Sequence, residues 1–286
     1  RRSIEKFVRV KDLEGPASLT DLPVARQRHC VCIKASSRNS HQHEGGSISM
    51  SQIDLNRSVG ALVADRPELS RVFEELQIDY CCHGSHTLQE ACQKQDLDPN
   101  EVLMKLTPPA ADASESRDWQ TAPLSELCDH IEQTHHAYLR TELPRLEQLI
   151  AKVAAVHRDK HPEFQDVKRV FQMLQDELVP HMMKEEQILF PAIRLLEAAT
   201  QSVQLPFGTV RNPIRMMEHE HDVAGDALSQ LRSVTSNYEV PEDACNTYRA
   251  TLDGLRELEL DLHLHIHKEN NILFPRAARR EEALVQ

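Results

Sequence analysis

The sequence predicts an all-α protein in which a four-helix bundle follows a small helical domain. Glycine is scarce, with 8 in 286 residues, and aromatic residues make up only 4%. This composition is typical of helices packed on aliphatic side chains. The C-terminal part of the chain shows four long helical patterns, and a segment within it occurs twice. Together, these observations favour a helical bundle over a sheet protein.

Residues 1–50 differ from the rest of the chain. They are polar and rich in Arg and Ser, and they show little apolar periodicity. The first methionine is Met50, and an ordered pattern begins just after it. We therefore expect a disordered extension here, and our hypothesis is that it represents sequence upstream of a start at Met50.

Residues 51–106 are expected to form a small domain of about four short helices with a cysteine pair on a loop. Helix start signals occur at 65–68, 87–90 and 98–101, where an Asp or Thr that can cap is followed three positions later by Glu. Residues 107–122 have the composition of a linker.

Residues 123–286 are predicted to form the bundle, with helices at roughly 124–157, 164–198, 213–235 and 243–280. The repeat lies within this region. His-Met-Met-Lys-Glu-Glu-Gln-Ile-Leu-Phe-Pro at 181–191 matches His-Ile-His-Lys-Glu-Asn-Asn-Ile-Leu-Phe-Pro at 265–275. A histidine precedes each copy, at His136 and His221. Each half is therefore predicted to be a helical hairpin, and we interpret Ile-Leu-Phe-Pro as core plus helix stop.

The spacing within the repeat predicts metal ligands. Residues i and i+4 share one helix face, so His and Glu of each copy project together. In the first hairpin, the chain runs about 21 residues from His136 to the turn and about 17 residues from the turn back to His181. At a rise of 1.5 Å per residue, the two histidines therefore lie at nearly the same height along the bundle axis. The second hairpin has unequal arms, so either its loop carries part of the return path or the helix boundaries given above are wrong by several residues. The predicted ligands are His136, His181, Glu185, His221, His265 and Glu269.

Four imidazoles and two carboxylates satisfy a pair of metal ions if each ion takes two imidazoles and both carboxylates are shared. This mixture suits iron or manganese better than zinc, and helix bundles hold carboxylate-bridged di-iron sites. Glu220 is a candidate to support a ligand. Five other histidines are expected to face solvent or to contact ligands, and not to be ligands themselves: His130, His135, His219, His263 and His267.

Cys81 and Cys82 form the second candidate site. A disulfide between neighbours closes a strained ring, so a structural bridge is not expected. The pair precedes a helix that begins near Thr87, and a helix N-terminus lowers a thiol pKa. We therefore predict a redox or metal-relay pair, with His83 and His86 as possible helpers; the alternative is two small buried loop residues.

Charge and cysteine content narrow the partners. The formal net charge is −12, which argues against nucleic acid because phosphate binding needs clustered Lys and Arg. No apolar run approaches the length of a bilayer span, so no membrane association is expected, and no secretory signal is recognisable. The chain has seven cysteines, without the spacing of a disulfide framework. Reduced thiols and a cytoplasmic location are therefore expected.

The order of these motifs closely resembles the iron-sulfur cluster repair di-iron proteins, the RIC family of YtfE/ScdA type with a hemerythrin-like bundle. The resemblance covers about residues 52–280 and includes Tyr-Cys-Cys-x-Gly at 80–84. It implies two non-haem iron ions with an oxo or hydroxo bridge, held by the six residues above, with Glu185 and Glu269 as bridging carboxylates. It also implies repair of damaged iron-sulfur proteins. The family's Cys-Cys-Gly-Gly-like loop has His83 at its third position here.

The sequence leaves several functions open. The leading hypothesis is iron supply to clusters damaged by nitrosative or oxidative stress. A second is enzymatic reduction of nitric oxide to nitrous oxide, because a bimetallic site holds two reactants close. A third is a dioxygen or nitric oxide carrier or sensor, against which Cys81 and Cys82 weigh. The sequence does not separate iron delivery from gas chemistry, and it leaves homodimer formation open.

Overall fold

The computed structural model describes residues 53–106 and 117–285. The predicted extension, residues 1–50, lies outside these ranges, as do residues 107–116 of the predicted linker. The last part of that linker contacts the bundle. The guanidinium of Arg276 donates hydrogen bonds to the carbonyl oxygens of Trp119 (2.7 Å) and Ala122 (2.5 Å). Residues 117–122 are therefore a bound segment, not a free connection.

The small N-terminal domain consists of α1 (Val59–Asp65), α2 (Leu69–Glu75), α3 (Leu88–Lys94) and α4 (Pro99–Leu106). The predicted capping box of α3 is present. The Oγ1 of Thr87 accepts the Glu90 N–H (3.2 Å), and the Glu90 carboxylate accepts the Thr87 N–H (2.8 Å). These bonds satisfy amides that would otherwise lack partners at the start of the helix. Buried apolar side chains from all four helices form one core.

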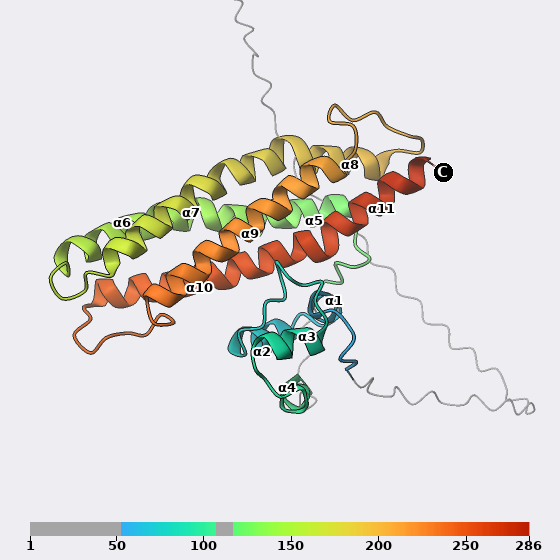
Figure 1. Ribbon diagram of the computed structural model, residues 1–286. Coiled ribbons are helices and arrows are strands. Elements are labelled where there is room, and N and C mark those ends of the chain that lie inside the picture. The colour runs from blue at the N-terminus through green and yellow to red at the C-terminus, as the bar shows by residue number, and fades with distance from the viewer. Residues whose placement is uncertain (1–52, 107–116, 286) are drawn as a thin grey trace, which may run out of the picture. The chain divides into compact units, whose positions relative to one another are not determined.

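The bundle is made of four long helices that run side by side (Figure 1). The helix α6 packs on α7 and α10, and α7 also packs on α9. The prediction of an all-α bundle preceded by a small helical region is confirmed. None of the helices in the described ranges is long and apolar enough to cross a membrane. In chain order, the long helices are α5 (Leu124–Ile131), η1 (Glu132–His136) and α6 (Ala137–Val156); α7 (Phe164–Lys184), η2 (Glu185–Leu189) and α8 (Phe190–Ala198); α9 (Arg211–Val234); and α10 (Asn246–Lys268), η3 (Glu269–Leu273) and α11 (Phe274–Val285).

The repeated Ile-Leu-Phe-Pro does not stop a helix, so that part of our interpretation is wrong. Pro191 and Pro275 each occupy the second position of a helix that continues, α8 and α11. A five-residue π-helical turn precedes each of these helices. The missing proline N–H therefore falls in the first turn of a new α segment, where its loss costs least. The core part of the interpretation is confirmed, because Phe190 and Phe274 are fully buried.

Two apolar cores fill the bundle. A layer of buried histidine and glutamate side chains, His136, His181, Glu185, His221, His265 and Glu269, separates them and is called the polar layer below. One core is built from α6, α7, α9 and α10, and the other from α5, α8, α9 and α11 together with η2 and η3. On α9, for example, Met217 belongs to one core and Ala224 to the other, and His221 lies between them. The predicted metal ligands on the other long helices also fall where one core ends and the other begins.

The second hairpin has the unequal arms that the spacing predicted. Helix α9 ends at Val234 and α10 begins at Asn246. The intervening loop reverses through Ser236, Asn237 and Tyr238, which all have positive φ (50°, 60° and 60°). Tyr238 is buried in the core beside the helices. The loop therefore carries part of the return path, as expected.

Asn271, on η3, anchors the cysteine loop of the small domain to the bundle. Its Nδ2 donates hydrogen bonds to the carbonyl oxygens of Tyr80 (3.3 Å) and Cys81 (3.2 Å). Two glycines leave room for this side chain. A Cβ on Gly84 would lie 2.5 Å from Asn271 Oδ1 and 2.6 Å from the Tyr80 carbonyl oxygen, and one on Gly60 would lie 2.7 Å from Asn271 Cγ. The glycine of Tyr-Cys-Cys-x-Gly therefore has a steric reason.

We predict that Gly60→Ala lowers the free energy of unfolding, although Gly60 lies in a helix. At an unhindered helix position the change would stabilise by about 1 kcal/mol. Here the added methyl group meets Asn271, and overpacking of this kind costs about 1–3 kcal/mol. Urea unfolding followed by circular dichroism measures the effect. In an Asn271→Ala background the same change should cost less, because only the contact at 2.9 Å with the Gly84 carbonyl oxygen remains, and equal losses in both backgrounds would refute the contact with Asn271.

Candidate metal centre

Three of the six predicted ligands lie at the ends of π-helical turns. His136 is the last residue of η1, Glu185 is the first of η2, and Glu269 is the first of η3. A π turn locally widens a helix, and such turns occur frequently at functional sites. The other three lie within α segments: His181 on α7, His221 on α9 and His265 on α10.

The structure brings all six side chains together in the polar layer. None is more than 3% exposed. They form two overlapping groups, and within each group the potential ligand atoms lie within 4.8 Å of one another. Each group contains one histidine from the first hairpin and one from the second. The spacing in the sequence did not predict this pairing. The first group contains His136 and His265, the second contains His181 and His221, and Glu185 and Glu269 belong to both.

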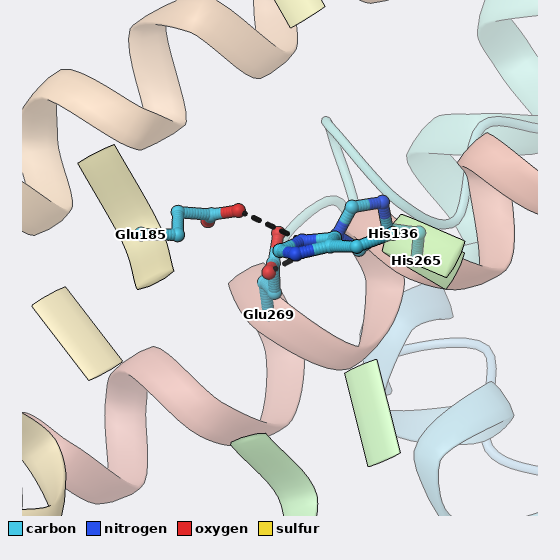
Figure 2. A group of neighbouring side chains, drawn as sticks. All are labelled: His136, Glu185, His265 and Glu269. Carbon is cyan, nitrogen blue, oxygen red and sulfur yellow. Dashed lines mark hydrogen bonds and ion pairs between the residues drawn. The ribbon is translucent and has the colours of Figure 1, made fainter. Parts of the chain in front are cut away.

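Imidazole nitrogens and carboxylate oxygens face one another across each group. In the first group, His136 Nε2 lies 3.2 Å from Glu185 Oε2, and His265 Nε2 lies 3.2 Å from Glu269 Oε1. Figure 2 shows these four side chains converging from three of the long helices, because His265 and Glu269 lie on the same one. The second group has similar spacing: His221 Nε2 to Glu269 Oε2 is 3.1 Å, and His181 Nε2 to Glu185 Oε2 is 3.4 Å.

The residues of the layer fit a pair of cations. Both carboxylate oxygens of Glu185, one of Glu269 and the Nε2 of His136 are buried without a hydrogen-bond partner. The Nε2 atoms of His181 and His221 face each other at 3.2 Å, so at most one of them can donate to the other. Buried polar atoms without partners are costly, and cations between these donors would satisfy them. Mixed imidazole and carboxylate donors suit iron or manganese.

A second set of contacts holds the imidazoles in place. The Nδ1 atoms of three of the four rings contact a carboxylate or amide oxygen. Such bonds fix the ring orientation and decide which nitrogen faces the centre. The pairs are His136 with Glu186 (2.7 Å), His181 with Glu220 (2.8 Å) and His221 with Asn270 (2.8 Å).

Only one of these three supports was predicted from the sequence. Glu220 does contact a predicted ligand, as expected. Glu186 and Asn270 were missed, although the repeat contains a signal for them. Each directly follows the Glu of its own copy, Glu185 or Glu269, and each contacts the upstream histidine of its own hairpin.

The other histidines have mixed roles. His135 is buried; its ring stacks on His265 at 5.2 Å, and its two nitrogens contact Asp261 and Lys268. His219 is exposed. For these two the prediction is right. It is wrong for His267, which is buried and contacts the carbonyl oxygen of Tyr80, because the small domain covers that face of α10. His130 stacks on Trp119, and His263 packs edge-on against Tyr80.

Contacts with charged side chains shift the pKa values of Glu220 and His221, at the metal centre. Burial acts to raise the pKa of Glu220, but hydrogen bonds from His181 and Lys184 outweigh it and lower this pKa to about 2. Burial acts to lower the pKa of His221, but its contact with Glu269 raises it to about 9. In the metal-free protein His221 therefore carries a proton at neutral pH. A metal ion must displace that proton, so metal affinity rises as the pH increases toward that value.

A small cavity of about 10 Å³ adjoins the layer between α7, α9 and α10. Its lining includes His181, His221 and His265 as well as the exposed Glu177. A space of this size holds about one water molecule. The cavity therefore leaves room beside these histidines for a water molecule or another small ligand from solvent.

The cysteine pair lies on the loop between α2 and α3, directly against the bundle. Cys82 Sγ is 3.5 Å from the carbonyl oxygen of His221, and the two sulfurs are 3.9 Å apart. Every cysteine in the described ranges is a free thiol. The rings of His83 and His86 stack at 5.5 Å.

The prediction that the following helix lowers a thiol pKa is wrong for Cys81. Helix α3 begins only at Leu88, and its first amides already have partners: the N–H groups of Leu88 and Gln89 donate to the carbonyl oxygens of Arg57 and Leu55, and that of Glu90 to Thr87 Oγ1. The hydrogen bond with Cys82, burial and the Asp79 carboxylate instead raise the pKa of Cys81 well above its ordinary value. In the free protein Cys81 is therefore a thiol.

Comparison with known families places this architecture among the hemerythrin-type cation-binding proteins. The model of the hemerythrin HHE cation binding domain matches residues 129–277. The model of the ScdA_N domain, a domain of unknown function, matches residues 55–109. The predicted hemerythrin-like character of the bundle is thereby confirmed.

Close relatives share nearly their whole length with this chain. The iron-sulfur cluster repair protein YtfE of Pectobacterium atrosepticum is 40% identical over 226 residues, which cover 79% of this chain and 98% of the relative. The protein of the same name from Escherichia coli O157:H7 is 39% identical with the same coverage. The chain therefore belongs to the YtfE family, and the resemblance seen in its motifs is confirmed.

We predict that Glu220→Ala weakens metal binding by about 10–100-fold, because His181 loses the partner that orients its ring. Competition for ferrous iron against a coloured chelator, without oxygen, measures the change. The matched control is Asp226→Ala, since Asp226 is an exposed carboxylate on the same helix. Equal affinities in the two variants would show that Glu220 does not support the centre.

Proposed function

We propose that this protein repairs iron-sulfur clusters damaged by nitrosative or oxidative stress, and that it does so by supplying iron. The iron would be held as a pair of non-haem ions in the polar layer, by the four imidazoles and the two shared carboxylates. The relatives described above carry the name of this repair role. Damaged iron-sulfur proteins are accordingly the partners.

One observation carries the proposal: Glu185 and Glu269 belong to both donor groups. Sharing lets two carboxylates serve two cations, so two negative charges offset part of the positive charge in a dry interior. Each group offers one donor atom from each of four residues. Iron commonly accepts more ligands than that, so positions would stay free for a bridging oxygen or for exchange.

Release of iron needs a side on which the layer is not sealed by protein. The small cavity beside His181, His221 and His265 supports this, because its lining reaches the exposed Glu177. The same space would admit nitric oxide or dioxygen to the metal ions. Cys81 and Cys82 would act in the transfer, since Cys82 touches the helix turn that carries His221.

Iron transfer to a damaged acceptor tests the proposal. The chain is loaded with isotopically enriched iron and mixed with a nitric-oxide-treated iron-sulfur dehydratase under reducing conditions. We expect enzyme activity to recover and the enriched isotope to enter the rebuilt cluster.

The matched variants are Glu269→Ala and Glu257→Ala, on the same long helix. Glu269 belongs to both donor groups, whereas Glu257 is exposed. Glu269→Ala should lose both its iron and its repair activity, because removal of a shared carboxylate leaves both donor groups incomplete. Glu257→Ala should keep its iron and its repair activity. Recovery of the acceptor with unlabelled iron only, or full repair by Glu269→Ala, would overturn iron supply.

A further inference from the structure

A second cluster of metal-binding side chains lies outside the polar layer, on the loop between α2 and α3. The carboxylate of Asp79 and the sulfurs of Cys81 and Cys82 offer donor atoms that all lie within 4.8 Å of one another. Cys81 Sγ is 3.3 Å from Asp79 Oδ1 and 3.9 Å from Cys82 Sγ.

The distance between the two sulfurs matches that of two ligands on one ion. Sulfurs bound at about 2.3 Å to a tetrahedral ion are about 3.8 Å apart. In a disulfide the sulfurs would be about 2.0 Å apart, and a bond between adjacent residues would strain the loop. The observed 3.9 Å therefore needs little movement to accept an ion and a large one to form a disulfide.

Asp79 organises the loop so that both thiols face the same place. Its Oδ1 accepts the backbone N–H groups of Cys81 (2.9 Å) and Cys82 (3.0 Å). Its Oδ2 contacts His83 Nδ1 at 2.6 Å. A turn cap needs only the backbone bonds. The imidazole behind the carboxylate is an additional feature, and a histidine–carboxylate contact of this kind orients carboxylate ligands of metals.

The loop is fixed to both helices that carry the second hairpin's donors. Cys82 Sγ touches the carbonyl oxygen of His221 on α9. The carbonyl oxygen of Cys81 accepts a hydrogen bond from Asn271, two residues beyond Glu269. The side chains of Asp79 and His83 are 38% and 50% exposed, so an ion there is reachable from solvent.

We propose that Asp79, Cys81 and Cys82 form a second site, for a single divalent transition-metal ion, and that its cargo is ferrous iron on its way from the polar layer to an acceptor. The assignment of the cargo rests on the proposed iron supply. Three protein donors leave a fourth position free, through which an acceptor's ligand can take the ion by exchange. The ion keeps its oxidation state. Binding releases the two thiol protons to solvent, so no oxidant or reductant is needed.

Cobalt(II) is the probe, because a cobalt–thiolate bond gives a near-ultraviolet charge-transfer band that imidazole and carboxylate ligands do not produce. The full chain is first loaded with iron and then titrated with cobalt without oxygen. We expect one cobalt per chain with thiolate bands and the visible bands of a tetrahedral ion. Absence of thiolate bands, or octahedral bands alone, would overturn the site.

Variants assign the thiolate signal to residues. Cys82→Ser should abolish tight binding, and Asp79→Asn, which keeps an acceptor for the backbone amides, should weaken it by at least about 10-fold. The control is Cys245→Ser, because Cys245 is an exposed thiol beside His157 that could bind cobalt by itself. Loss of the bands in Cys245→Ser, or normal affinity in Asp79→Asn, would contradict the proposal.

The two proposals fail separately. Cobalt binding at the loop is read without any repair assay, so it can succeed even if the layer supplies no iron. Conversely, Cys82→Ser should keep its iron in the layer while transferring it to an acceptor more slowly. If Cys82→Ser transfers labelled iron at the normal rate although the loop of the unsubstituted chain binds cobalt, the loop is a metal site but iron does not pass through it during transfer.

Discussion

Two carboxylates buried among four imidazoles are the constraint on which the rest of this structure depends. Glu185 and Glu269 have no measurable exposure, and several of their oxygens lack hydrogen-bond partners. Leaving such charges in a low-dielectric interior would cost several kcal/mol each. Apolar cores border the layer on both sides, and the cavity beside His181, His221 and His265 is small, so the compensation must come mainly from the layer itself: from protonated imidazoles such as that of His221 in the free protein and from cations when they are bound.

Sharing these carboxylates also couples the two halves of the bundle. Each donor group combines one histidine from the first hairpin with one from the second. A bound ion therefore links the hairpins to each other and does not merely occupy one of them. Metal binding should accordingly stabilise the packing between hairpins, since binding free energy adds to the folding free energy of the form that binds. The cysteine loop is tied to the same region through His221 and Asn271, so the small domain contacts the helices closest to the centre.

Much of this arrangement could be predicted from the sequence because it is encoded at fixed spacings. The i, i+4 pairs His181–Glu185 and His265–Glu269, together with the duplicated segment, identified six residues that the fold does bring together. The π-helical turns could not be predicted, because one extra residue per turn leaves the local composition unchanged. They also explain why Pro191 and Pro275 do not end their helices. The raised pKa of Cys81 was missed because it arises from the hydrogen bond with Cys82, from burial and from the Asp79 carboxylate, which the folded loop brings together.

We propose that the six buried residues hold a pair of iron ions, to which Glu185 and Glu269 would both contribute. The most direct measurement is the metal content of the chain purified without oxygen, together with Mössbauer spectra of the oxidised protein. We expect about two irons per chain that are magnetically coupled, since both donor groups share Glu185 and Glu269. A single metal per chain, a pair of uncoupled irons, or zinc in place of iron would contradict it.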